Sequence, residues 1–229
     1  MNVFLVLAAL FALLNWFAVY TPRPRLERIA KPAAMLFLIL WFATRLPETM
    51  PAAGSLFLLG LGFSLTGDIF LMLDRRHFIK GLLAFLLAHV CYVLTFNLGG
   101  VFINAPLLVL AAVIGVLAFL LVRRIASSLR ARNNGGLIPP VAVYALVLAL
   151  TFWSTVSTFW RPAWNGAGAW LAFAGGTLFF TSDSLLAWDR FVAPIARGRF
   201  WTMLSYHSAQ LALTLSMLFA LGCLEYVCF

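Results

Sequence analysis

Charged side chains are scarce in this sequence. Asp, Glu, Lys and Arg make up 10% of the 229 residues, whereas 64% are hydrophobic. A soluble domain carries about 25% charged residues, so this chain has too few to cover a surface that faces water. The composition excludes soluble and disordered classes and predicts an integral membrane protein, with membrane lipids as its surroundings.

Several local signatures are also missing. The three cysteines, Cys91, Cys223 and Cys228, form no CxxC pair, which argues against a disulfide framework or a zinc ribbon. No HExxH or G-x-S-x-G occurs, so neither a zincin nor an elbow-type serine hydrolase is indicated. No basic residue precedes the first apolar run, so we expect a retained first helix and not a cleaved signal peptide.

Long apolar runs fill the chain instead. A helix needs about 20 apolar residues to cross the hydrocarbon core. The sequence predicts one all-α, polytopic membrane domain over 1–229 with eight transmembrane helices. We expect them at 3–20, 32–46, 55–73, 79–96, 103–122, 138–157, 167–187 and 201–222.

The basic residues alternate between the connections of these helices. Fourteen of the sixteen Lys and Arg, Lys31 among them, fall in the first, third, fifth and seventh connections. The positive-inside rule then places these connections in the cytoplasm and both termini outside it. The net charge of +9 thus suits an anionic membrane surface and not a nucleic acid partner. The short loops suit a bacterial inner (plasma) membrane.

An internal repeat divides the chain. Residues 66–75 and 181–190 both read Thr-x-Asp-x-x-Leu-x-x-Asp-Arg. The following helices carry His89 with Tyr92 and His207 with Gln210, each pair three residues apart. We expect two four-helix halves, 1–96 and 103–229, related by an axis along the membrane normal.

Asp68 and Asp183 are the candidate catalytic residues. Each lies six residues before a terminal Asp-Arg, about 9 Å inward along a helix. A carboxylate at that depth is costly unless it faces a cavity or a partner, and no Lys or Arg is expected there. Two acids in one cavity would leave one protonated, which suits general acid/base catalysis. The alternative is a structural role, with both bonded to Ser and Thr hydroxyls across a helix interface.

Other polar residues are expected beside the two acids. His89 and His207 reach a similar depth, and Tyr92 and Gln210 follow one turn deeper. Each histidine could equally be a hydrogen-bonded packing residue. Zinc is not expected, because the only other histidine, His77, falls in a loop. The remaining supporting candidates are Tyr144, Ser182 and Tyr206.

These residues together resemble the YhhN family of membrane lysoplasmalogenases. The resemblance covers the predicted helices from the third to the eighth. It is carried by Thr66-Gly67-Asp68 with Leu71-Met72-Leu73, by Phe78, Gly81 and Phe85 through His89 and Tyr92, by Tyr144, by Ser182-Asp183 with Leu186-Ala187, and by Tyr206 with Gln210.

The resemblance implies hydrolysis of the vinyl ether bond of lysoplasmalogens, with a lysophospholipid substrate and no metal or organic cofactor. The products would be a fatty aldehyde and glycerophosphoethanolamine or glycerophosphocholine. Two acids are compatible with this chemistry, because one can protonate carbon and the other can activate water. Arg75, Arg76 and Arg190 could meet the phosphate, or could serve only as topology anchors.

Two other functions use the same features. A proton-coupled transporter also places paired acids in a two-fold repeat, although Gly67 is the only helix interruption near them. An intramembrane aspartyl protease also uses two membrane aspartates. Gly67-Asp68 is similar to a site of that kind, but the surroundings of Asp183 are not.

Overall fold

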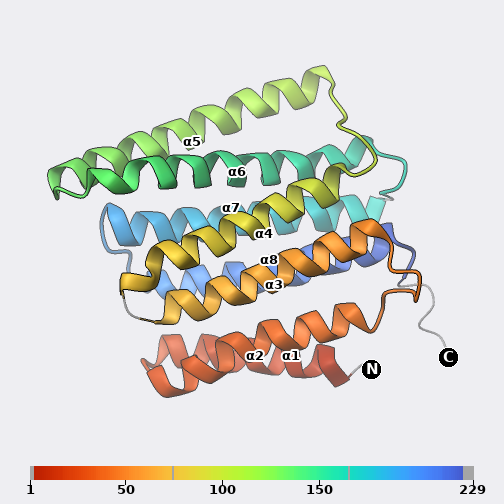
Figure 1. Cartoon of the computed structure of the whole chain (residues 1–229), viewed down its shortest axis with the longest axis horizontal. Helices are drawn as coiled ribbons and strands as arrows, with labels where there is room; N and C mark the ends of the chain where they lie inside the picture. Colours follow the sequence, from red (N-terminus) through yellow and green to blue (C-terminus); the bar gives the residue numbers. More distant parts are fainter. Residues whose placement is uncertain (1–2, 74, 165, 224–229) are drawn as a thin grey trace.

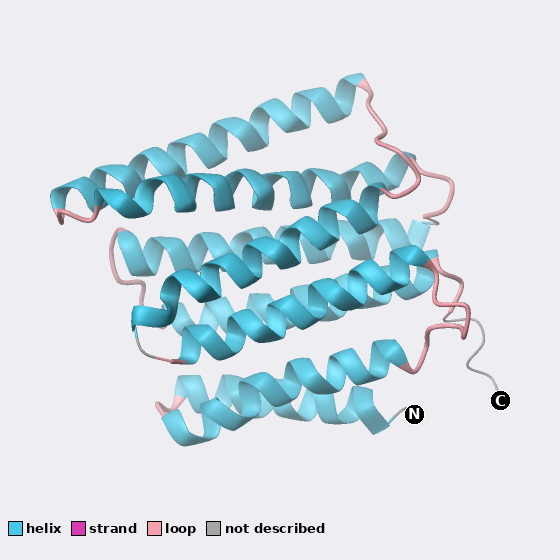
Figure 2. Cartoon of the chain, viewed as in Figure 1, coloured by secondary structure: helices cyan, strands magenta, loops and turns pink. Residues whose placement is uncertain are grey.

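The computed structural model describes residues 3–73, 75–164 and 166–223, so Cys228 lies outside the described part. Over these residues it contains α-helices, three short 3₁₀ turns and no strand (Figures 1 and 2), which confirms the all-α prediction. The helices are α1 (Val3–Tyr20), α2 (Pro24–Ala43), α3 (Ala52–Met72), α4 (Phe78–Asn97), α5 (Ala105–Ala131), α6 (Ile138–Ser157), α7 (Gly166–Phe191) and α8 (Gly198–Ala220).

The helices lie side by side and alternate in direction. The connections α1–α2, α3–α4, α5–α6 and α7–α8 gather at one end, on the left in Figure 1. We call it the basic end, because it holds most of the arginines. The start of α1, the end of α8 and the other connections lie at the opposite end.

Two helices differ most from the ranges that the sequence predicted. α2 begins at Pro24 and not at 32, because proline is well tolerated at the first position of a helix. Lys31 therefore lies inside α2 and not in a loop. α5 continues to Ala131, beyond the expected end at 122, so that Arg123 and Arg124 lie on the helix as well.

In the described part of the chain, five helical segments are long and apolar enough to cross a membrane: α1, α3, α4, α5 and the segment Gly135–Trp160 that contains α6. Their outer faces expose large apolar side chains such as Val109, Phe119 and Leu146. Exposed apolar surface on this scale marks contact with lipid or another apolar partner. The other helices, α2, α7 and α8, carry more charged and polar residues.

The inner helices pack closely against their neighbours. α2 packs on α1, α3 and α8, while α6 packs on α4, α5 and α7. Gly176 lets α7 approach α6 so closely that a Cβ there would overlap the Thr155 hydroxyl. Small residues at such interfaces are the usual device for bringing membrane helices together.

Candidate functional site

A cavity of about 420 Å³ lies between the helices and is lined by residues of α2 to α8. We divide its polar lining into two parts. The cavity mouth, at the basic end, comprises Glu27, Arg28, Asp189, Arg190 and Arg199. The cavity floor comprises Lys31, Asp183 and Tyr206 further along these helices, together with Asp68 of α3 and Tyr144 of α6. The two sequence-predicted acids thus line one cavity.

Asp68 lies on α3 and is fully buried. Its Oδ1 lies 3.0 Å from Nζ of Lys31 on α2, with 1% and 6% of the two side chains exposed. The Tyr206 hydroxyl on α8 donates a hydrogen bond of 2.8 Å to Asp68 Oδ2. The expectation that no Lys or Arg reaches this depth is therefore wrong. Lys31 was counted as a loop residue, whereas it faces the interior from the second turn of α2.

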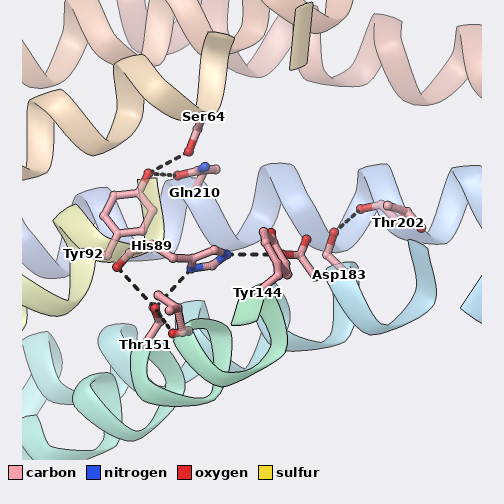
Figure 3. A network of polar contacts seen from close by, with 10 residues as sticks. Ser64, His89, Tyr92, Tyr144, Thr151, Asp183, Thr202 and Gln210 are labelled. Atoms are coloured by element: carbon pink, nitrogen blue, oxygen red, sulfur yellow. Dashed lines mark hydrogen bonds and ion pairs between the residues drawn. The ribbon is translucent and has the colours of Figure 1, made fainter. Parts of the chain in front are cut away.

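Asp183 on α7 has a different set of partners (Figure 3). Its Oδ2 lies 3.2 Å from Nε2 of His89 on α4, and it accepts a hydrogen bond from the Tyr144 hydroxyl on α6. His89 is fully buried, and its Nδ1 lies 3.2 Å from Oγ1 of Thr151, also on α6. Four residues from three helices thus form one chain of hydrogen bonds.

The Thr151 hydroxyl determines how protons are placed in this chain. Its single hydrogen can be donated to the carbonyl of Val147 at 2.9 Å, to that of His89 at 3.4 Å, or to Nδ1 of His89. When it goes to a carbonyl, Thr151 Oγ1 accepts from His89, so that Nδ1 of His89 carries a hydrogen. In that arrangement the hydrogen bond between His89 Nε2 and Asp183 Oδ2 holds one further proton.

Tyr92 and Gln210 lie behind the cavity and do not line it. The Tyr92 hydroxyl donates to Gln210 Oε1 at 3.0 Å and lies 3.2 Å from Ser64 Oγ (Figure 3). All three side chains are fully buried. Their bonds join α3, α4 and α8, so these residues support the helices that carry the acids.

His207 faces a different part of the molecule from His89. Its Nδ1 accepts a hydrogen bond of 3.1 Å from Nε1 of Trp16 on α1, and it does not line the cavity. The expectation that both histidines stand beside the acids is therefore wrong for His207. α8 turns Tyr206, the neighbouring residue, toward Asp68 instead.

The other expected residues are divided between the cavity and its surroundings. Ser182 lines the cavity, and its hydroxyl donates to the carbonyl of Thr202 on α8 at 3.1 Å. Arg190 also lines the cavity, with its guanidinium 3.8 Å from the centre of the Phe78 ring. Arg76 is exposed and does not line it, and the side chain of Arg75 is outside the described part.

Comparison with known proteins identifies the relatives of this chain. The model of the YhhN family matches residues 26–217, a span that holds every charged residue of the cavity. The chain belongs to the YhhN family. It is 32% identical to the lysoplasmalogenase TMEM86B of Mus musculus over 190 residues, which cover 82% of this chain and 73% of the mouse protein.

Two further relatives carry the same kind of name. The lysoplasmalogenase TMEM86A of Bos taurus is 29% identical over 172 residues, 73% of this chain and 67% of that protein. The human lysoplasmalogenase TMEM86B is 31% identical over 141 residues, 62% of this chain and 54% of that protein. No solved structure matches the chain.

The charged residues of α2 are the part of this YhhN-family site that sequence reasoning missed. Pro24, Glu27, Arg28 and Lys31 all line the cavity. They follow the i, i+3, i+4, i+7 spacing of one helical face. Pro24 as a helix start would have revealed this face, because it moves Lys31 from a loop onto a helix that points inward.

The cavity is lined by carboxylates, and a histidine contacts one of them; both residue types bind metals elsewhere. Within the part of the chain that the structure describes, no group of three His, Cys, Asp or Glu side chains could hold a metal ion. The two aspartates are instead engaged by Lys31 and Tyr206 on one side and by His89 and Tyr144 on the other.

Proposed function

We propose that this YhhN-family protein is a lysoplasmalogenase, which hydrolyses the vinyl ether bond of lysoplasmalogens. The products are a fatty aldehyde and glycerophosphoethanolamine or glycerophosphocholine. One observation carries the proposal: two carboxyl groups with separate, unlike partners line a single cavity between apolar helices, in a chain whose curated relatives are named lysoplasmalogenases. The cavity accepts the polar head of the lipid, and the single hydrocarbon chain stays among the helices.

The reaction requires an acid and a base in turn. A proton is added to the second carbon of the alkenyl chain, and the first carbon becomes part of an oxocarbenium ion. Water adds to that carbon and gives up a proton, which produces a hemiacetal. The hemiacetal then breaks its bond to the glycerol oxygen, which takes a proton, and the aldehyde leaves. General acid/base catalysis of this kind contributes about 10²–10⁴-fold.

Asp183 is the proton donor in this proposal. The proton that it shares with Nε2 of His89 can move to the second carbon of the alkenyl chain. The Tyr144 hydroxyl then stabilises the remaining carboxylate by a hydrogen bond. When the hemiacetal collapses, its hydroxyl proton returns to Asp183. His89 therefore acts as the partner that keeps this proton available, because its other nitrogen is held by Thr151.

Asp68 is the base. Lys31 and Tyr206 place a cation and a hydroxyl donor on its two oxygens, and both favour the carboxylate form. The carboxylate takes a proton from the attacking water and later passes it to the glycerol oxygen that leaves. Each aspartate ends the cycle as it began, and one water molecule has been added across the bond.

We further propose that all eight helices cross the membrane, with both termini on the non-cytoplasmic side. The arginine-rich connections at the basic end then face the cytoplasm, as the positive-inside rule requires. α2, α7 and α8 are less apolar than the others because they carry the charged residues of the cavity other than Asp68, and these residues face the interior and not lipid. A bacterial inner membrane suits this topology.

The test is aldehyde release from a lysoplasmalogen by purified protein in detergent, with EDTA present. We expect Asp68→Asn and Asp183→Asn each to lose at least about a hundredfold in kcat, the scale of a lost general acid or base. Glu48→Gln is the matched control, because Glu48 is exposed at the opposite end of the molecule. Wild-type protein that is folded but inert would refute the proposed function and favour a transporter. Peptide cleavage would indicate a protease.

A further inference from the structure

We propose that the cavity mouth is a subsite for a zwitterionic phosphoamine headgroup. Arg28 and Arg199 bind the phosphate, and Glu27 binds the cationic amine. The inference rests on the proposed function and deepens it, since it names the groups that recognise the polar end of the substrate.

The charges of the cavity are balanced, unlike those of the chain. Seven acidic residues occur in the whole sequence, and four of those that the structure describes line this cavity: Glu27, Asp68, Asp183 and Asp189. Four described cationic residues line it as well: Arg28, Lys31, Arg190 and Arg199. The chain has a net charge of +9, yet its cavity is lined by equal numbers of acidic and cationic side chains. Such a cavity suits a ligand that carries both signs.

The mouth lies at the right level relative to the floor. On α2, Arg28 and Glu27 come three and four residues before Lys31, about 4.5 and 6 Å along the helix axis. On α8, Arg199 comes seven residues before Tyr206, about 10.5 Å along its axis. In a lysoplasmalogen the three carbons of glycerol separate the vinyl ether oxygen from the phosphate. A vinyl ether at the floor therefore places the phosphate and its amine at the mouth.

Glu27 and Arg199 already show the complementary charges. Arg199 Nη2 lies 2.5 Å from Glu27 Oε1, which joins α2 to α8 across the mouth, with 69% of the Arg199 side chain and 12% of the Glu27 side chain exposed. The exposed guanidinium of Arg199 can turn to a phosphate. The largely buried carboxylate of Glu27 would then lack a cation, which the amine of the headgroup supplies. Arginine suits the binding of phosphate, because its fork of N–H groups matches phosphate oxygens.

The other two mouth residues are already engaged. Asp189 Oδ1 accepts a hydrogen bond of 2.7 Å from the backbone N–H of Ile195, and Arg190 lies against the Phe78 ring. Glu27 is thus the carboxylate best placed for an amine. A ligand with phosphate alone would leave the charge of Glu27 unmatched, so the amine contributes to recognition.

Binding of saturated-ether analogues tests the subsite without any reaction. A 1-alkyl ether lacks the double bond that is protonated, so it binds without turnover. Three probes differ only in their head: 1-alkylglycerophosphoethanolamine, 1-alkylglycerophosphate and 1-alkylglycerol. Their dissociation constants, as mole fractions in mixed micelles, are measured by calorimetry for wild type, Arg28→Gln/Arg199→Gln and Glu27→Gln. Arg25→Gln is the matched control, because Arg25 is exposed on the same turn of α2 but does not line the cavity.

We expect the double arginine variant to bind both phosphate-bearing probes at least about tenfold more weakly and 1-alkylglycerol as wild type does, since hydrogen bonds between charged groups are lost. Glu27→Gln should weaken the phosphoethanolamine probe several-fold and should not weaken the phosphate probe. Arg25→Gln should match wild type with all three.

Three equal affinities in wild type, or equal losses on all three probes in the variants, would overturn the subsite. Aldehyde release is measured in parallel on the same proteins. The expected binding pattern without aldehyde release would support the subsite and refute the proposed function. Aldehyde release together with equal binding of the three probes would support the proposed function and refute the subsite.

Discussion

Replacing Lys31 alone should destabilise the protein more than replacing Lys31 and Asp68 together. The reason is the position of the pair. Nζ and Oδ1 are 3.0 Å apart, and the two side chains are 6% and 1% exposed. Lys31→Met leaves a buried carboxylate without its cation, and Asp68→Asn leaves a buried ammonium without its anion. The double variant leaves neither charge.

The size of the effect follows from this distance. Two unit charges 3.0 Å apart attract each other by about 5.5 kcal/mol at an effective dielectric constant of about 20. Breaking a buried pair by removing one partner costs about 3–5 kcal/mol. We therefore expect each single variant to lose about 3–5 kcal/mol in the free energy of unfolding. The double variant should lie within about 2 kcal/mol of wild type, because the cost of desolvating both charges disappears with them.

The assay is equilibrium unfolding by SDS in mixed micelles, followed by far-UV circular dichroism for the four proteins of the cycle. Additive losses, or a loss below about 1 kcal/mol for Lys31→Met, would refute a buried ion pair. Aldehyde release by the same four proteins distinguishes a loss of stability from a loss of catalysis. The double variant should be stable and inactive, because the base Asp68 is absent.

Three further outcomes are expected. Tyr144→Phe removes a hydrogen-bond donor from the carboxyl group of Asp183, so kcat for aldehyde release should fall about tenfold or more. His207→Leu should keep kcat within about twofold of wild type, because His207 bonds Trp16 outside the cavity; only the stability should fall, by about 1 kcal/mol. Gly176→Ala should lower the free energy of unfolding by about 1–3 kcal/mol, since its Cβ would overlap the Thr155 hydroxyl and push α7 from α6.

Each of these has its own control. Gly115→Ala on α5 should be tolerated, because a Cβ there meets nothing within 4 Å; an equal loss at both glycines would contradict the close approach of α6 and α7. A large loss of kcat in His207→Leu would show that the floor of the cavity extends to α1. Unchanged kcat in Tyr144→Phe would remove Tyr144 from the chemistry.

Much of the fold could be read from the sequence. Apolar runs and the near absence of charge predicted a helical membrane protein, and the helical structure confirms that class. The family resemblance carried by the two Asp motifs was confirmed by the YhhN match. The start of α2 was predicted wrongly. Its N-terminal part holds Arg25, Glu27, Arg28 and Lys31, and hydropathy alone assigns such a stretch to a loop.

The sequence by itself determined the class of protein and the position of Asp68 and Asp183 along their helices, six residues before each terminal Asp-Arg. These properties depend only on local composition and on the rise of each residue along a helix. Only the tertiary structure decided which partner each acid meets: Lys31 and Tyr206 for Asp68, His89 and Tyr144 for Asp183. The same holds for His207, which matches His89 in depth but faces Trp16. The physical reason is that packing sets the rotation and neighbours of every helix, and sequence spacing contains no information on which helix another face will touch.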